Sequence, residues 1–430
     1  MKDKSFAEKS SDPVNNSVVV GLDIGTTKIA CFVGVKNEHG KIEIISQGKS
    51  ESLGVKKGVV FNIDKTINSI KAAIEDTARN CPEGDLNLKH VVVGIAGQHI
   101  RSMQTSDSYT RKNREEEISQ DDIKAFVNSI HEMVMSPGEE IITVVPQEFN
   151  VDGEQGIKDP VGMAGVRLEA NFHIITGQVS NVTNIYNCVR RAGLEISEVI
   201  LEPIASAEAV LSEEEKEAGI VLVDIGGGTT DVAIFHDGII RHTAVIPFGG
   251  NIITQDIRTG CRILERHAEK LKVKFGSALA SESSEKEVVC IPGLRGQKSK
   301  EITVRNLASI IEARMVEIIE KVNNEIQNSG YAKEIIGGIV ITGGGSKLKH
   351  LTQLFEYLTG MDARIGYPNE HLANTNDESL TSPIFSTGIG LMLKGFEKNT
   401  RVLEPAPEED IKKGKFFDAV LRGVENLFKD

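Results

Sequence analysis

The chain has 430 residues, and its 49 lysines and arginines against 62 aspartates and glutamates give a formal net charge of -13. This acidic balance argues against a protein that holds nucleic acid by general basicity. The length suffices for about two to four domains with substantial cores.

The first 17 residues are polar and contain no apolar core of signal-peptide length. No later stretch approaches the ~18 apolar residues that span a bilayer. We therefore expect a flexible arm over 1–17, no cleaved export signal and no transmembrane helix. The five cysteines show no CxxC spacing, which predicts reduced and unpaired thiols.

After the arm, the segment VVVGLDIGTTKIACFVGV predicts a strand, a tight turn and a second strand, because β-branched runs flank a Gly/Thr centre. The segment IVLVDIGGGTTDVAIF, from Ile220, repeats this pattern. Two similar hairpins predict a duplicated α/β unit whose halves face each other. Helical patterns over 63–78 and 179–192 lie between them.

Residues 88–165 read as a separate inserted subdomain with its own strand, HVVVGIAG, and its own helix. That helix is predicted to begin near Ser119, which forms a capping-box pattern with Asp122.

In the second half, residues 251–330 are predicted to be mostly helical, with a mobile Ser/Glu-rich loop within 277–300. The segment IIGGIVITGGGSKLKHL then predicts a buried strand that runs through three glycines into a helix. A last helix over 386–396 precedes a linker, 397–410, with two prolines and five acidic against two basic residues.

The two hairpin turns have the composition of a phosphate clamp. Glycines let main-chain N–H groups approach phosphate oxygens, and threonine hydroxyls and a lysine add donors. Asp23 and Asp224, each at the end of a buried strand, suit Mg2+ or its waters better than a phosphate. The candidate phosphate contacts are Gly25, Thr26, Thr27 and Lys28 in the first turn, and Gly226, Gly227, Gly228, Thr229, Thr230 and Asp231 in the second.

A third glycine-rich element, Gly343, Gly344, Gly345 and Ser346, suits the close approach of a nucleoside and its α-phosphate. Each element alone is also compatible with an ordinary glycine turn, so the prediction depends on all three together. The sequence contains no GxxxxGK[ST], and the GGG at 226 leads into a strand without GxGxxG spacing. P-loop and dinucleotide-binding interpretations are therefore excluded.

The three motifs, in this order, resemble the phosphate 1, phosphate 2 and adenosine motifs of the actin/Hsp70/sugar-kinase superfamily. Within it, the chain resembles the FtsA family of bacterial division proteins over residues 18–396 and the C-terminal tip. The segments that carry the narrower resemblance are VGLDIGTTK, KDPVGMAGVRLEANFHIITG, LEPIASAEAVL, RHTAVIPFGGNIITQDI and VITGGGSKLKHL.

This resemblance implies a two-lobed actin-like α/β fold with duplicated mixed sheets that binds ATP and Mg2+. It also implies the following division of the chain: subdomain 1A over 18–87 and 166–205, the self-association subdomain 1C over 88–165, subdomain 2A over 206–247 and 337–396, subdomain 2B over 248–336, a linker over 397–413 and a membrane-targeting helix over 414–430.

The resemblance also implies roles for individual residues. Glu202 stands where relatives direct a carboxylate toward metal or attacking water, although a solvated helix-start acid is the alternative. Gln178 is a second, weaker candidate for positioning water. Glu269 and Lys272 have the i, i+3 spacing with which relatives hold adenine and ribose, and a plain surface ion pair is the alternative. ATP binding is therefore expected, and the sequence leaves hydrolysis open.

FtsA-like proteins polymerise, bind the C-terminal peptide of the ring protein FtsZ on subdomain 2B and recruit later division proteins. Arg314 and Glu317, in a helix that resembles the docking helix, are candidate contacts with that peptide, and an ordinary i, i+3 pair is an equal alternative. The implied location is peripheral, on the cytoplasmic face of the inner membrane at the division septum.

The last residues, GKFFDAVLRGVENLFKD, predict an amphipathic helix whose apolar side chains fall within an arc of about 140°. Residues 411–430 carry five bases and three acids, which favours anionic lipid modestly. Docking on the chain's own core is the alternative. The candidate membrane contacts are Phe416, Phe417, Val420, Leu421, Val424, Leu427 and Phe428.

Two rival functions use the same fold. A pilus-assembly adaptor would be distinguished by copurification with inner-membrane pilus components, and a small-molecule kinase by ATP consumption that a sugar or polyol stimulates.

Overall fold

The structure is a computed structural model that describes residues 18–37, 39–81, 88–111, 116–291, 298–369, 371–373 and 380–402, the last six in backbone only. The predicted arm over 1–17, most of the linker and the whole candidate membrane helix lie outside these ranges. Among the described residues, no helix combines the length and the apolar character required to cross a bilayer. All five cysteines are free thiols.

Two five-stranded mixed sheets form the two lobes, and they repeat one topology. In each, a central buried strand pairs antiparallel with the strand after the glycine turn and parallel with a strand from later in the chain. The predicted duplication is therefore confirmed. The first sheet has the order β11(Glu195–Leu201), β6(His90–Ile95), β1(Val19–Ile24), β2(Lys28–Lys36), β3(Ile42–Glu51), and the second β14(Ile239–Ile246), β13(Thr230–His236), β12(Ile220–Ile225), β17(Ile339–Thr342), β18(Ala363–Ile365).

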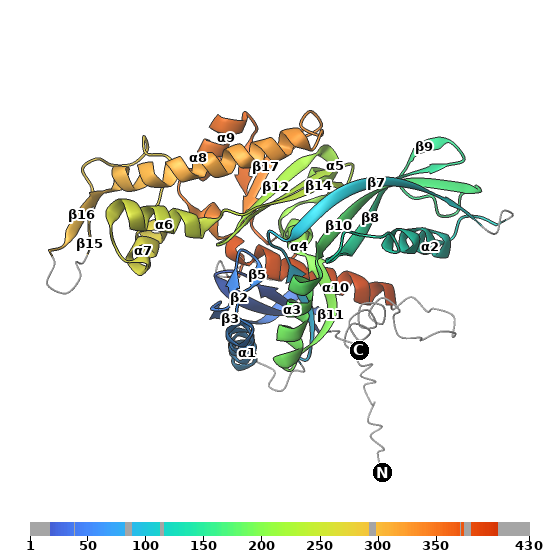
Figure 1. The fold of residues 1–430 in the computed structure, drawn as a ribbon, viewed down its shortest axis with the longest axis horizontal. Coiled ribbons are helices and arrows are strands. Elements are labelled where there is room, and N and C mark those ends of the chain that lie inside the picture. The colour runs from blue at the N-terminus through green and yellow to red at the C-terminus, as the bar shows by residue number, and fades with distance from the viewer. Residues whose placement is uncertain are drawn as a thin grey trace, which may run out of the picture.

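Helices α4 (Glu202–Val210) and α10 (Ser386–Val402) lie between the two sheets and share one apolar cluster with both (Figure 1). The approach of α10 to β1 is close, because a Cβ on Gly21 would stand 2.7 Å from the carbonyl oxygen of Gly388. The helix continues to Val402, beyond the predicted end at 396, so the first part of the predicted linker is helical.

The outer faces of the sheets are covered by amphipathic helices whose apolar stripes enter the lobe cores. The helices predicted over 63–78 and 179–192 are confirmed as α1 and α3. The bounds are α1(Ile63–Arg79) and α3(Val179–Arg191) on the first lobe, and α5(Glu213–Ala218), α6(Gly250–Cys261), α7(Glu265–Phe275), α8(Val304–Asn328) and α9(Leu351–Thr359) with the second.

The inserted subdomain is a four-stranded sheet, with the order β7(Ile100–Thr110), β10(Arg167–Gln178), β8(Glu139–Val151), β9(Glu154–Ile157), covered on one face by α2(Gln120–His131). The predicted capping box of Ser119 and Asp122 starts α2. The predicted boundaries of 88–165 are wrong at both ends, because β6 belongs to the first-lobe sheet and β10 to the inserted sheet. The apolar run of β6 resembles that of the second half of β10, so composition did not tell which sheet each strand joins.

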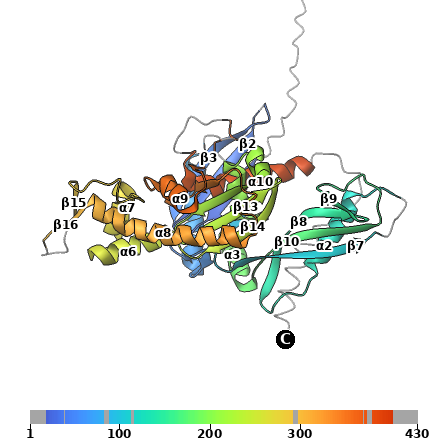
Figure 2. The same ribbon diagram turned by 90° about the horizontal axis from the view of Figure 1, so that it is seen from above.

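Although it branches from the first lobe, the inserted subdomain docks on β14, the edge strand of the second-lobe sheet. Figures 1 and 2 show it projecting to one side of the molecule. Three of its side chains donate to main-chain oxygens of β14. These bonds run from Ser102 Oγ to Thr243 (2.7 Å), from Gln104 Nε2 to Arg241 (2.8 Å) and from Gln147 Nε2 to Ile240 (3.1 Å).

The segment predicted as a mobile loop over 277–300 is anchored in its described part. Ser277 is buried, the N–H of Ala278 donates to the carbonyl oxygen of Lys349 (2.8 Å) and the N–H of Ala280 donates to Glu312 (2.8 Å). The segment then enters a hairpin at the far end of the molecule from the inserted subdomain (Figure 2). The remaining elements are β4(Val55–Lys56), β5(Val59–Val60), β15(Val288–Ile291), β16(Lys300–Thr303), η1(Gly344–Lys347) and η2(Pro383–Phe385).

Candidate functional site

A cavity of about 480 Å³ lies between the two lobes, at the carboxyl ends of β1 and β12. Its walls come from both hairpin turns, from the starts of α4 and α6, from α7 and from the glycine turn after β17. The structure brings most of the predicted site residues together here: Asp23, Gly25, Thr26, Thr27, Lys28, Glu202, Asp224, Gly226, Gly227, Gly228, Thr229, Asp231, Glu269, Lys272, Gly343, Gly344 and Gly345.

The two hairpin turns face each other across this cavity. A Cβ on Gly227 would stand 1.9 Å from Thr27 Oγ1, and a Cβ on Gly228 would stand 2.7 Å from Thr26 Oγ1. Side chains at 227 and 228 would therefore collide with the first turn. Because Gly227 and Gly228 have no Cβ, the two turns can approach closely enough for main-chain N–H groups of both lobes to bind the same ligand.

Three buried carboxyl groups, of Asp23, Asp224 and Asp231, and the half-buried carboxyl group of Glu202 lie together beneath the turns. Burial raises the pKa of Asp23 and of Asp224, and burial with the nearby Asp224 raises the pKa of Asp231 to about 8. Burial, and then the charges of Asp23, Asp231 and Asp224, hold the pKa of Glu202 well above its usual range. Lys28 opposes the shifts of Asp23, Asp224 and Glu202. The site is therefore short of positive charge, which a metal ion would supply.

The acid of the second turn is held in place by hydroxyl groups. Ser206 Oγ of α4 and Thr387 Oγ1 of α10 donate to Asp224 Oδ2 at 2.8 and 3.3 Å. Gly343 has a φ of +81° and leaves room for the same carboxylate, since a Cβ there would lie 2.2 Å from Asp224 Oδ1. The Asp23 carboxylate accepts no hydrogen bond within the part of the chain that the structure describes.

The chemistry of these acids fits a divalent cation that is bound mainly through water. Asp231 Oδ1 is buried and has no hydrogen-bond partner in the structure, so it is an acceptor available to a hydrated ion. In the described ranges, no group of three or more His, Cys, Asp or Glu residues has the spacing of a direct metal site.

The opposite end of the cavity is formed by α7. Lys272 Nζ forms an ion pair with Glu269 Oε2 (2.8 Å) and donates to Thr254 Oγ1 (2.9 Å) and to the carbonyl oxygen of Gly250 (2.8 Å). The pair thus has the ion-pair geometry considered as the alternative, and it also lines the cavity.

Three predicted site residues do not line the cavity. Thr230 follows the alternation of β13 to the face opposite its neighbour Asp231, and its hydroxyl donates to the carbonyl oxygen of Phe248 (2.8 Å). Ser346 lies in the 3-10 turn η1, which replaces the predicted direct entry into an α-helix, and donates back to Gly343 (2.7 Å). Gln178 is exposed at the N-cap of α3 and accepts from Asn181.

The cavity also has walls that the sequence analysis missed. Asn251 belongs to the PFGGN segment quoted for the resemblance, and its position at the start of α6 was the available signal. The others come from helices, strand ends and loops that only tertiary structure brings here. They are Ile24, Gly58, Ala96, Gly250, Ile253, Val273, Lys347, Leu348, Pro383, Ile384 and Thr387.

The candidate partner residues lie on α8, away from this cavity. Arg314 makes a two-pronged ion pair with Asp256 of α6, at 2.6 and 3.2 Å, and a further pair with Glu317. The i, i+3 pair is therefore present, and α6 supplies a third member.

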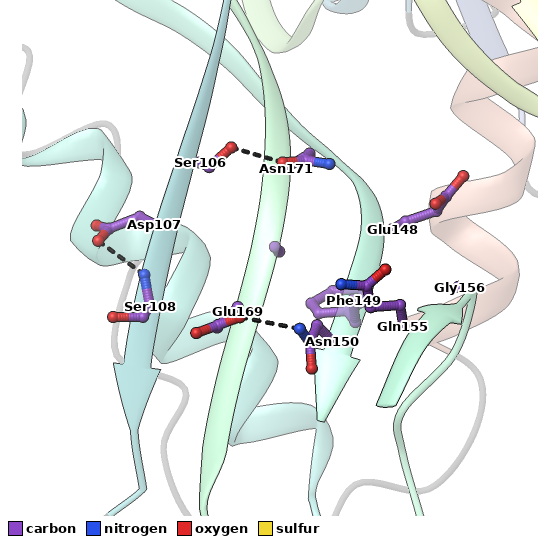
Figure 3. A pocket seen from close by; sticks show the side chains of 11 residues that line it. Ser106, Asp107, Ser108, Glu148, Phe149, Asn150, Gln155, Gly156, Glu169 and Asn171 are labelled. Atoms are coloured by element: carbon purple, nitrogen blue, oxygen red, sulfur yellow. Dashed lines mark hydrogen bonds between the residues drawn. The ribbon is translucent and has the colours of Figure 1, made fainter. Parts of the chain in front are cut away.

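A second hollow, of about 560 Å³, lies on the face of the inserted sheet away from α2 (Figure 3). Its polar side chains satisfy one another. Ser106 Oγ donates to Asn171 Oδ1 (2.6 Å), and Asn150 Nδ2 donates to Glu169 Oε2 (2.9 Å). This hollow lacks the buried, unpartnered acceptor that marks the cleft between the lobes.

Comparison with known proteins agrees with this geometry. Residues 221–390 match the family described as cell division protein FtsA, and residues 97–176 match the SHS2 domain inserted in FtsA, which coincides with the inserted sheet. The cell division protein FtsA of Pseudomonas aeruginosa is 38% identical over 386 residues, covering 90% of this chain and 91% of the relative.

Two solved structures share the fold at low sequence identity. The PilM–PilN type IV pilus biogenesis complex has a TM-score of 0.63 at 17% identity, covering 88% of this chain and 98% of that one. MreB5 of Spiroplasma citri bound to AMPPNP has a TM-score of 0.55 at 16% identity, covering 91% and 99%. The actin-like fold implied by the resemblance is thus confirmed, and together with the family match it shows that this chain belongs to the FtsA family of cell division proteins.

Proposed function

We propose that this chain binds Mg-ATP between its lobes, polymerises, and tethers the FtsZ ring to the cytoplasmic membrane at the septum, where it recruits later division proteins. The observation that carries the nucleotide part is that the two glycine turns face each other, with Gly227 against Thr27, beside the four acids Asp23, Glu202, Asp224 and Asp231. Nucleotide in the MreB5 neighbour is consistent with this use of the fold.

When bound, Mg2+ would supply the positive charge that the buried acids lack, and it would draw the phosphates toward the turns. Asp23, Asp224 and Asp231 would hold its waters. The turn amides, Thr26, Thr27 and Lys28 would address phosphate oxygens, and Glu269 with Lys272 would face the nucleoside. Glu202 would orient water only if the positive charge of the metal lowered its raised pKa. We therefore propose ATP binding as the main activity, with hydrolysis that is weak at most.

Self-association is assigned to the inserted subdomain and FtsZ docking to subdomain 2B, where Arg314 and Glu317 are the candidate contacts. Arg314 keeps an exposed edge while it is oriented by Asp256, which suits it to receive a carboxylate from a peptide. The membrane helix over 414–430 would bind lipid weakly alone. Polymerisation would gather many copies on one surface and raise the apparent affinity without new contacts.

Liposome co-sedimentation with FtsZ tests this proposal, with and without ATP and with and without the last fifteen residues. The full chain should carry FtsZ into a pellet of anionic vesicles, more strongly with ATP, and the shortened chain should leave it in the supernatant. Leu421→Glu, on the apolar face, should abolish pelleting, whereas Asn426→Glu adds the same charge to the polar face as a control. Pelleting by the shortened chain would contradict the membrane assignment.

A further inference from the structure

A small hairpin of the first lobe, β4–β5, reaches the phosphate end of the cleft. Val55 pairs with Val60 and Lys56 with Val59, which leaves Lys57 and Gly58 as the turn. Both have positive φ, 49° and 72°, as a two-residue type I′ hairpin requires. The turn is therefore tight and its position is well defined.

This turn contacts both phosphate turns. The N–H of Gly58 donates to Thr26 Oγ1 at 3.2 Å, so it is joined to the first turn. On its other side, the main-chain N and Cα of Lys57 lie 2.9 Å from the position of a Cβ on Gly228, in the second turn. The Lys57–Gly58 turn thus contacts both phosphate turns, and Gly58 lines the cavity while the exposed Lys57 stands at its margin.

The side chain of Lys57 crosses to the second lobe. Its ammonium lies 6.0 Å from the ring centroid of Phe248, whose carbonyl oxygen accepts the Thr230 hydroxyl of the second hairpin. Within the described ranges, Lys57 forms no ion pair with a carboxylate. Its neighbour Lys56 instead lies 5.0 Å from the ring of Phe61, in its own lobe. The side chains of Lys56 and Lys57, adjacent in one hairpin, therefore contact different lobes.

The distribution of positive charge in the cleft indicates a role for Lys57. Lys272 is paired with Glu269 at the nucleoside end, and Lys28 faces the acids beneath the turns. Lys347 also lines the cavity, but it belongs to the glycine turn after β17, which is the element predicted to receive the nucleoside and its α-phosphate. A third phosphate adds negative charge at the end where Lys57 retains a cation without an acidic partner. We infer that Lys57 is the residue that makes this site prefer nucleoside triphosphate over diphosphate, and that Phe248 links its position to the second lobe. The inference rests on the proposed nucleotide binding.

Calorimetric titration of the full chain with Mg-ATP and with Mg-ADP tests it. Lys57→Ala should weaken ATP about tenfold and leave ADP within about twofold, since an exposed cation contributes a modest, screened attraction. Lys57→Arg keeps the charge and should keep the preference. Lys56→Ala is the matched control and should change neither affinity. Rising salt should reduce the ATP preference of the unmodified chain and not that of Lys57→Ala.

The outcomes separate the inference from the function on which it rests. An ATP-to-ADP ratio in Lys57→Ala equal to that of the unmodified chain, or an equal loss for both nucleotides, would overturn the role of Lys57 while leaving nucleotide binding intact. An unmodified chain that binds neither nucleotide would remove the proposed function itself. Urea unfolding of each variant identifies any loss that comes from misfolding.

Discussion

The two glycine hairpins share a topology but differ in how their acids are supported. Asp23 stands with Lys28 in its own turn, and its carboxylate accepts no hydrogen bond among the described residues. Asp224 has no cation in its turn, which ends in a second acid, Asp231, and it is held by Ser206 and Thr387. The duplicated turns have therefore diverged. The first supplies a cation suited to phosphate, and the second supplies a pre-oriented acid suited to hydrated metal.

The largest effect that this comparison predicts comes from removing the supported acid. Asp224→Ala should abolish measurable Mg-ATP binding, a loss of about 100-fold or more, because a fixed acid contributes more to metal affinity than a free one. Asp23→Ala, the matched variant in the other turn, should lose less. Isothermal titration measures both. Equal losses would erase the difference between the hairpins, and unchanged affinity in Asp224→Ala would reject the clamp.

A smaller effect is expected from crowding the approach of the turns. Gly227→Ala would place a Cβ 1.9 Å from Thr27 Oγ1, whereas the nearest atom to a Cβ on Gly226 is 3.3 Å away. Gly227→Ala should therefore weaken ATP about tenfold, or roughly 1.4 kcal/mol, and Gly226→Ala only slightly.

Combining Gly227→Ala with Thr27→Ala tests the origin of that loss. Removal of the threonine hydroxyl should restore part of the affinity, because the clash that it relieves is specific to this pair. A double variant as weak as the sum of the two single variants would show that the two turns do not meet in solution.

A separate prediction concerns pH and the second hairpin. Burial with Asp224 raises the pKa of Asp231 to about 8, far above its unfolded value of 3.8. The folded state therefore binds more protons between these values, so the free energy of unfolding falls as pH rises from about 4 to 8. The melting temperature of the metal-free chain should be lower at pH 8 than at pH 5. Asp231→Asn should reduce this dependence, and the slope that remains belongs to Asp23, Asp224 and Glu202, whose pKa values are also raised. An unchanged slope in this variant would contradict the assignment to Asp231.

The two hairpins could be predicted from the sequence because strand, glycine turn and strand are contiguous in each. The repetition of this pattern in both halves of the chain then implied that the two turns face each other. It could not place Thr230, whose orientation depends on which residue of β13 begins the alternation. The Lys57–Gly58 turn escaped notice for another reason. Its tie to Thr26 joins residues far apart in the chain, and nothing in VKKGVV distinguishes it from an exposed hairpin.

The accuracy of the predicted subdomain boundaries was limited for the same reason: the sequence shows local patterns but not which distant strands pair. β6 and the second half of β10 are both runs of mostly buried residues, yet β6 joins the first-lobe sheet and β10 the inserted sheet. The end of α10 was placed too early because the acidic residues and prolines of 397–410 suit a linker, whereas the helix continues to Val402, before the first of those prolines. The predicted helices α1, α2 and α3 were strongly amphipathic, and their existence followed from that periodicity.

The bonds from Ser102, Gln104 and Gln147 end on main-chain oxygens of β14, so their acceptors remain whatever residues occupy that strand. Sequence drift at positions such as 240 and 243 is thus compatible with the same joint, provided that the three donors persist. The joint also occupies an otherwise open strand edge, which protects it from adventitious strand pairing. The inserted subdomain is covalently joined to the first lobe and hydrogen-bonded to the second. Any rotation of one lobe relative to the other must therefore break these hydrogen bonds or change the orientation of the inserted subdomain.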